Sequence, residues 1–573
     1  MRYQEAPTPE VEERIFSNDY ADLLINYSGD LSVLQKFEDA AIHIINYFYA
    51  TLHVPLDQIT EDIVTVLGYS VMPSLFGVIS QGSLEASGIG KIRNIPSLNL
   101  RGEGVLIGFI DTGIDYTNPI FQYADKTTRI AAIWDQTIRT GTSPASGGYG
   151  SEYTREQINA ALQSKAPFEV VPSRDENGHG TLIAGIAAGN EVAESGFSGV
   201  APDAEFLIVK LKLAKPYLKN FFRIPEEALC FQENDIMFGL DYLIDTAASL
   251  RRPLVICVAV GSSQGAHDGR GSLSNYFSLQ SENIGIASVV AAGNEGNGRR
   301  HYYGRVDPNT GYDTVELNVG ENESGFSMEL WSNSPNIFTL DILSPSGEYI
   351  SRFGATLDEN RVISFIFEST TIIVDYQMVE SQSGDQLILV RFTDPAPGIW
   401  RFRVFSRNRE SQGFNIWLPM SGFISEETYF IRSDPYTTIL SMGNTRVPIT
   451  ITAYNSQDDS LYLNASRGYT RIGVVKPDLA APGVEVLGPT LDQGFAAATG
   501  TSVSAAHAAG IAAMLLEWGM VRGNYPNMGT VELKIFLIRG ARRNQGMSYP
   551  NRDWGYGILD IFNTFDVIRS EQQ

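Results

Sequence analysis

Cysteine is scarce in this sequence, with Cys230 and Cys257 the two examples among 573 residues. So few thiols argue against a disulfide framework, and they exclude a metal site built from cysteine alone. No apolar run reaches the roughly 18 residues of a membrane-spanning helix, so we expect no membrane span. The start of the chain, MRYQEAPTPEVEERIF, lacks the basic and apolar regions of a signal peptide. We therefore expect synthesis in the cytoplasm without an export signal.

Basic residues are also in short supply. The chain has 42 lysines and arginines against 66 aspartates and glutamates, which gives a net charge of −24. Nucleic acids and anionic membranes both bind cationic surfaces, so we expect neither as a partner. Aromatic residues make up 11% of the chain, which is typical of a folded protein rather than a disordered one. The length predicts several domains.

The first predicted domain is a small α/β unit over residues 1–81. Residues 31–50, LSVLQKFEDAAIHIINYFYA, have the apolar spacing of a helix, and residues 64–80, VTVLGYSVMPSLFGVIS, read as extended. A stretch that contains several glycines and serines follows at residues 80–104. Such a stretch is typical of a linker or of a junction that is cut.

The second predicted domain is split, over residues 82–301 and 436–573. VLIGFIDTG, PLVICVAVG and IASVVAAGNEG each read as a buried strand, and ENDIMFGLDYLIDTAASL has the spacing of an amphipathic helix. This alternation predicts an α/β fold with a doubly wound, mostly parallel sheet. Residues 302–435 contain short strands separated by turns, which predicts an inserted all-β domain of the sandwich or jelly-roll type.

A serine lies at the start of a predicted helix whose side chains are unusually small, in the segment GTSVSAAHAAG, residues 500–510. The simpler interpretation of Ser502 is a helix cap before a tightly packed helix. The alternative is a nucleophile at the positive end of the helix, which needs a base and a group to orient that base.

His179 is the strongest candidate for this base among the six histidines. It lies between Gly178 and Gly180 at the start of a predicted helix, where another chain can approach closely. Asp111 ends a buried strand, where an unpaired carboxylate is rare, and it is the candidate orienting group. A turn cap is the alternative for Asp111. Sites in open α/β sheets lie at the carboxyl ends of strands, which favours the first interpretation.

These residues lie in segments that resemble the motifs of the subtilisin-like serine proteases. IGFIDTGID resembles their aspartate motif, GHGTLIAG their histidine motif and GTSVSAAHAAG their serine motif. The resemblance implies that Asp111, His179 and Ser502 form a catalytic triad. SVVAAGNEG resembles the segment that carries the oxyanion asparagine, here Asn294. VAVGSS, around Gly261, resembles the edge that pairs with substrate backbone.

The layout is similar to that of the clostridial germination-specific subtilases, a group whose members activate a protein zymogen. This resemblance implies an endopeptidase that acts on protein substrates, and it adds packaging in spores as an expectation. A catalytically silent scaffold or sensor is the alternative function. For the insert, a structural clamp is the simpler interpretation, and a carbohydrate-binding module is the alternative.

The resemblance also implies that residues 1–81 are a prosegment. We expect the enzyme to cut itself between Gln81 and Gly82, within two or three residues, and to retain the freed unit as an inhibitor. No cofactor is expected to be required. Calcium is frequent in the family, but no spacing in this sequence specifies a calcium site.

Overall fold

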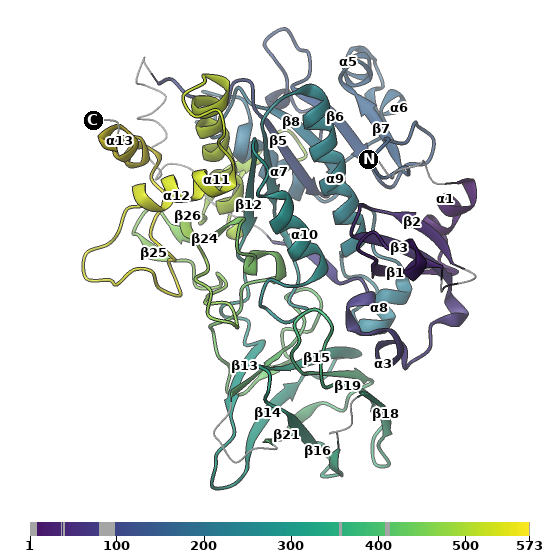
Figure 1. The fold of residues 1–573 in the computed structure, drawn as a ribbon. Coiled ribbons are helices and arrows are strands. Elements are labelled where there is room, and N and C mark those ends of the chain that lie inside the picture. Colours follow the sequence, from purple (N-terminus) through teal and green to yellow (C-terminus); the bar gives the residue numbers. More distant parts are fainter. Residues whose placement is uncertain are drawn as a thin grey trace.

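The computed structural model describes residues 8–35, 37, 40–79, 98–353, 358–406 and 413–571. Figure 1 shows a central α/β part, an N-terminal unit at one side of it, and a β part below both. We call the three the α/β part, the N-terminal unit (residues 8–79) and the β insert (residues 301–430).

The large sheet of the α/β part is mostly parallel, as the sequence predicts. Its central strands pair in parallel in the order β24-β12-β10-β5-β8-β6, while β7 and β25 pair antiparallel at the two edges and β26 runs parallel to β24. The strands are β5 (Leu106–Asp111), β6 (Ile130–Asp135), β7 (Ser151–Thr154), β8 (Glu205–Lys210), β10 (Leu254–Val258), β12 (Ile286–Ala291), β24 (Ile449–Asn455), β25 (Ser460–Leu461) and β26 (Leu479–Pro482).

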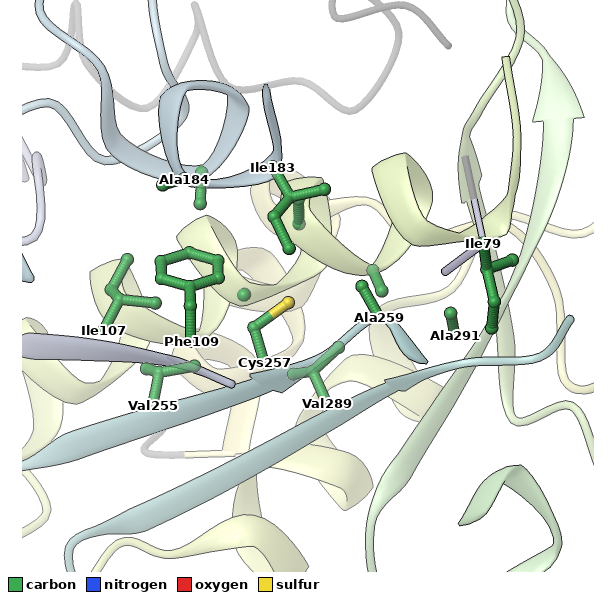
Figure 2. Close-up of a cluster of buried hydrophobic side chains, with 14 of the residues drawn as sticks. Ile79, Ile107, Phe109, Ile183, Ala184, Val255, Cys257, Ala259, Val289 and Ala291 are labelled. Carbon is green, nitrogen blue, oxygen red and sulfur yellow. The ribbon is translucent and has the colours of Figure 1, made fainter. Parts of the chain in front are cut away.

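Helices cover both faces of this sheet, because alternate side chains of each central strand enter two separate cores. Helices α7 (His179–Ala188) and α11 (Thr501–Leu516) pack in the core that holds Phe109 and Cys257 (Figure 2). Helices α9 (Glu233–Leu250) and α10 (Ser272–Gln280) pack in the core on the other face. The remaining helices of this part are α5 (Arg155–Gln163), α6 (Pro167–Val170), α8 (Pro216–Phe222), α12 (Thr530–Gly540) and α13 (Ile561–Glu571).

Helix α11 is bare because other segments approach its axis closely. A Cβ atom on Gly510 would lie 2.4 Å from Cβ of Val200 and 2.7 Å from the carbonyl oxygen of Ala187. The stretch Thr501–Val521 is the one described helix that is long and apolar enough to cross a membrane by length and composition, and 89% of its most apolar 18 residues are buried inside the protein. Burial of this kind is typical of a core helix.

A buried arginine joins loops of the α/β part. The Arg129 guanidinium donates to the backbone carbonyls of Pro202, Ala204, Ile120 and Ala188, at 2.6 to 2.8 Å. Its side chain is 1% exposed. One positive group therefore satisfies carbonyls from several separate segments of the chain.

The N-terminal unit contains a sheet in the order β1-β3-β2, and it corrects two expectations. Residues 64–80, expected to be extended, begin in a helix that ends at Leu67, and in the described part their strand is confined to Leu75–Val78. Within residues 31–50, helix is confined in the described part to α2 (Leu31–Leu34), and the predicted longer helix is wrong. Asn46 makes the turn between β2 and β3, because its Oδ1 accepts from the backbone N–H groups of Phe48 and Tyr49. The elements are α1 (Pro9–Phe16), β1 (Tyr20–Asn26), β2 (Ala41–Ile44), β3 (Tyr49–Pro55), α3 (Ile63–Leu67) and β4 (Leu75–Val78).

The β insert consists of strands in the described part, as predicted. One of its sheets has the order β13-β22-β15-β20-β19-β18 and the other β17-β16-β21-β14-β23, with a shared apolar core. The strands are β13 (His301–Arg305), β14 (Tyr312–Val319), β15 (Gly325–Ser332), β16 (Phe338–Leu343), β17 (Tyr349–Phe353), β18 (Asp358–Ser364), β19 (Thr371–Gln377), β20 (Leu387–Thr393), β21 (Gly398–Ser406), β22 (Gly413–Trp417) and β23 (Tyr429–Phe430).

One carboxylate connects all three parts. Glu329 of the β insert accepts from the Tyr69 hydroxyl of the N-terminal unit at 2.6 Å and from the Gly265 backbone N–H of the α/β part at 2.9 Å. The indole N–H of Trp331 donates to it at 2.9 Å. Burial raises the pKa of Glu329, so these donors compensate a group that is costly to desolvate. The β insert therefore contacts both neighbouring parts.

Candidate active site

Asp111 and His179 form a buried pair at one end of the large sheet. Asp111 is the last residue of β5 and His179 the first of α7, and they are 1% and 4% exposed. The distance from His179 Nδ1 to Asp111 Oδ1 is 2.7 Å. A carboxylate on Nδ1 fixes the orientation of the ring and leaves Nε2 for a second partner.

The glycines on both sides of His179 are needed for this geometry. Gly178 has a φ of 92°, in the left-handed region that favours glycine. A Cβ atom on Gly180 would lie 2.1 Å from the carbonyl oxygen of Gly113. The segment after β5 and the start of α7 can therefore approach each other only without side chains at Gly180.

Ser502 is buried near the start of α11 and does not cap it. The N-cap position is Gly500, so the capping interpretation of Ser502 is wrong. Within the part of the chain that the structure describes, the Ser502 hydroxyl has no hydrogen-bond partner. An unsatisfied buried hydroxyl costs about 1–3 kcal/mol, which is typical of a group kept for chemistry rather than for stability.

Asn294 lies beside the residue that precedes Ser502. Its Oδ1 accepts from the Thr501 backbone N–H at 3.1 Å and from the Thr501 hydroxyl at 3.2 Å. The Thr501 hydroxyl in turn accepts from the Gly293 backbone N–H at 3.0 Å. These bonds fix the amide so that its oxygen is engaged and its NH₂ group is directed elsewhere. Asn294 and the start of α11 therefore form one rigid unit.

The predicted substrate edge around Gly261 is occupied by the protein's own chain. Strand β4 pairs antiparallel with β11 (Val260–Gly261), with Val78 opposite Val260 and Gly77 opposite Gly261. On its other side β4 pairs antiparallel with β9 (Phe231–Gln232). The end of the N-terminal unit thus adds a strand between two strands of the α/β part, the arrangement of β-augmentation.

This strand delivers a peptide carbonyl to the candidate base. His179 Nε2 lies 3.1 Å from the carbonyl oxygen of Ile79. Ile79 is 2% exposed and belongs to the same buried cluster as Ala259 and Ala291, in which Figure 2 labels it. A peptide group of the chain therefore contacts the imidazole on the side away from Asp111.

Two opposing effects set the pKa of His179. Burial lowers it, while the charge and hydrogen bond of Asp111, the Ile79 carbonyl and Asp175 raise it. The raising effects prevail, and the pKa lies above the usual value of 6.5. While Ile79 occupies the site, His179 therefore binds a proton more readily than an ordinary imidazole does.

Two further expectations concern the cleavage position and a metal site. Gln81 and Gly82, the expected cleavage position, lie outside the described residues. Among the described residues, no group of three or more His, Cys, Asp or Glu side chains could hold a metal ion.

The sequence did not reveal the roles of Gln264 and Glu233. These side chains accept from the backbone N–H groups of Leu75 and Ser74 at 2.8 and 3.0 Å. No local pattern marks these residues, because their partners lie far away in the sequence.

The sequence matches a model of a known protein family. The family model of the subtilases matches residues 102–315 and 433–557, together more than half of the chain. These ranges include Asp111, His179, Asn294 and Ser502, and the gap between them, residues 316–432, covers most of the β insert.

The individual relatives share only a low sequence identity with this chain. Subtilisin-like protease SBT2.2 of Arabidopsis thaliana is 23% identical over 493 residues, which cover 73% of this chain and 54% of that protein. Subtilisin-like protease SBT1.9 of the same plant is 24% identical over 529 residues, 84% of this chain and 64% of that protein. The chain thus spans about half to two thirds of the length of these relatives. The solved structure of the CspB protease of Clostridium perfringens has a TM-score of 0.76 and 30% identity, covering 85% of this chain and 97% of that one.

Proposed function

Because this chain belongs to the subtilase family, whose members are serine endopeptidases, we propose that it hydrolyses peptide bonds by acyl transfer. One observation carries the proposal. A peptide carbonyl lies 3.1 Å from Nε2 of a histidine whose Nδ1 is held by a buried aspartate at 2.7 Å. Helix α11, which carries Ser502, packs against the helix of this histidine, α7, and the Ser502 hydroxyl is buried without a partner in the described chain.

In the proposed reaction Ser502 attacks the carbonyl carbon while His179 accepts its proton. His179 then donates this proton to the leaving amine, and Asp111 stabilises the imidazolium that forms in between. The Asn294 amide and the Ser502 backbone N–H would hold the oxyanion. The bonds from Thr501 to the Asn294 amide oxygen support this role, because they fix the amide beside the start of α11.

The N-terminal unit is proposed to be a prosegment that the enzyme cuts from itself. The support is that β4 fills the groove at Gly261 and ends at His179, as a substrate would. We place the cut at the Ile79–Ser80 bond, two residues before the Gln81–Gly82 bond expected from the sequence. After the cut, β4 would remain paired on both sides, so the freed unit would act as an inhibitor.

The proposed role in the organism is activation of a protein zymogen, as in germination, with storage in spores. Its support is the likeness to the CspB protease together with the shared layout. This role rests on similarity alone, whereas the peptidase activity rests on the site.

The test of the peptidase proposal combines labelling and sequencing. N-terminal sequencing of purified protein should find a new start at or close to Ser80, and a fluorophosphonate probe should label Ser502 once the bound N-terminal unit has been displaced. Ser502→Ala should abolish both the labelling and the cut. A purified Ser502→Ala chain that still cuts itself would overturn Ser502 as the nucleophile, whereas a wild-type chain that neither labels nor cuts would leave the scaffold interpretation instead.

A further inference from the structure

The pairing of β4 assigns each of its residues a position relative to the proposed cut. If the Ile79–Ser80 bond is cut, then Val78 is the second residue before the cut and Gly77 the third. Gly77 lies opposite Gly261 in the antiparallel pair. This assignment rests on the proposed function above.

Gly77 lies directly beneath two side chains of the β insert. A Cβ atom built on Gly77 would lie 3.2 Å from Cε1 and Cζ of Phe423 and 3.3 Å from Cε of Met420. These distances are tighter than ordinary van der Waals contact, so a methyl group fits only if its neighbours move by a few tenths of an ångström. The φ angle of Gly77 is not in the left-handed region. The restriction at Gly77 is therefore one of space and not of backbone conformation.

The chain that carries these two side chains is firmly held. Met420 and Phe423 are each 3% exposed, and the Phe423 N–H donates to the Met420 carbonyl at 3.0 Å. Ser421, between them, donates its backbone N–H to the Glu295 carboxylate at 3.2 Å. Glu295 directly follows Asn294, so the chain that carries Met420 and Phe423 is bonded next to the proposed oxyanion site.

A further bond ties the start of this segment to the substrate edge. The Ser263 hydroxyl donates to the carbonyl of Leu418 at 3.0 Å, and Ser263 lies two residues after Gly261. Ser421 and Gly422 are exposed, but the segment is bonded to both Glu295 and Ser263, so it cannot move aside without breaking these bonds. We call residues 418–423 the cover segment.

The residues on either side of Gly77 lie in different surroundings. Phe76 is 1% exposed and packs in an apolar core with Phe231, Val260 and Leu273, whereas Val78 is half-buried. The groove thus has room for a large aromatic side chain at the fourth position and for a branched one at the second. At the third position, side chains of the β insert leave no room for a Cβ atom unless they move.

We propose that Met420 and Phe423 are specificity-determining residues that restrict the third residue before the cut bond to glycine, with alanine accepted at a lower rate. The β insert is then part of the substrate groove in addition to any clamping role. Protein substrates of this enzyme are those with a large apolar residue followed by glycine at these positions, as in the enzyme's own Phe-Gly-Val-Ile.

The test uses self-processing of the full chain during cell-free synthesis, followed on gels over time. Gly77→Ala should slow the cut, and Gly77→Leu should slow it further, by about tenfold to 100-fold, the usual effect of overpacking a tight site. Adding Phe423→Ala to either variant should recover most of the lost rate. The matched control is Phe326→Ala, which removes a buried phenylalanine from the core of the β insert and should recover nothing.

The outcomes separate this proposal from the one on which it rests. Equal rates of cutting for wild type, Gly77→Ala and Gly77→Leu would overturn the proposed restriction while leaving the peptidase proposal intact. A loss of rate in Gly77→Ala that Phe423→Ala does not reduce, or that Phe326→Ala reduces equally, would also overturn it. Gly77→Ala adds one methyl group, so it keeps the test decisive if Gly77→Leu fails to fold. A wild-type chain without any cut or probe labelling would overturn both proposals.

Discussion

Replacing Lys215 by methionine is expected to loosen the N-terminal unit from the α/β part. The Lys215 ammonium group donates to Asp22 Oδ1 at 2.7 Å and to the carbonyls of Arg14 and Tyr20 at 2.9 and 3.1 Å. Asp22 is fully buried. Burial alone would raise the pKa of Asp22, but Lys215 and His53 outweigh burial and hold this pKa well below its usual range. The carboxylate is therefore charged and depends on these partners.

The magnitude follows from what the substitution leaves behind. Methionine keeps the length of the side chain but has no donor, so Asp22 retains His53 at 2.6 Å and Gln232 at 2.9 Å among the described residues. Removing one partner of a buried ion pair costs about 3–5 kcal/mol, because the remaining charge is not compensated. We therefore expect docking of the unit to weaken about 100-fold to several thousand-fold.

Hydrogen exchange of β4 measures this docking. The comparison uses the Ser502→Ala chain, which stays uncut, with and without Lys215→Met. Amides of Leu75–Val78 should exchange at least about 100-fold faster in the variant, whereas Lys165→Met, at an exposed lysine, should change nothing. Unchanged protection in Lys215→Met would refute the reasoning. An equal cost of Lys215→Met in an Asp22→Asn background would show that the lysine does not act through the carboxylate.

Three further predictions concern single residues. Asn294→Ala should lower kcat by about 100- to 1,000-fold with little change in KM, a magnitude known from subtilisin itself; steady-state kinetics on a peptide substrate would contradict this with an unchanged kcat. Self-processing needs neutral His179, and the pKa of His179 is raised in the uncut chain. The rate of self-processing should therefore fall as the pH decreases, with an apparent pKa above 6.5. A rate that stays constant from about pH 6 to 8 would refute this. Arg129→Met should lower the free energy of unfolding by about 1–3 kcal/mol for each carbonyl that water cannot reach, and a urea titration that superimposes on wild type would contradict it.

The candidate site was largely accessible from the sequence because its residues lie where local patterns change. Asp111 ends a run of apolar residues, and His179 and Ser502 begin helices, so each is marked by its own neighbours. The large sheet was predictable for the same reason, since its strands are short continuous apolar runs. These features depend on a few residues in sequence and not on the tertiary fold.

The contacts around β4 could not be predicted in this way. The residues that meet at Ile79 and His179 are far apart in sequence, and nothing in the composition of LFGVIS marks it as the strand that fills the groove. The helix expected over residues 31–50 failed for a related reason. Its apolar residues have spacing that suits a helix, but Ala41–Ile44 form β2 and pair antiparallel with β3. The four residues of β2 are too few to show the alternation of a strand, so pairing in the tertiary fold overrides the local spacing.

The position of the β insert also has a consequence for the order in which the protein is completed. Strands β12 and β24 pair in parallel although the whole insert lies between them in sequence. The insert's own β13 and β22 pair, with His301 opposite Trp417, so a folded insert brings its two ends together and removes most of the intervening loop.

Shortening the loop in this way reduces the entropic cost of pairing β12 with β24 by about 1 kcal/mol. On the ribosome, Asp111, His179 and Asn294 are synthesised before the insert and Ser502 after it. A nascent chain therefore holds the proposed base and the proposed oxyanion donor but lacks the proposed nucleophile until the insert has emerged and had time to fold. The proposed catalytic centre would thus be completed last, when the N-terminal unit is already available to occupy it.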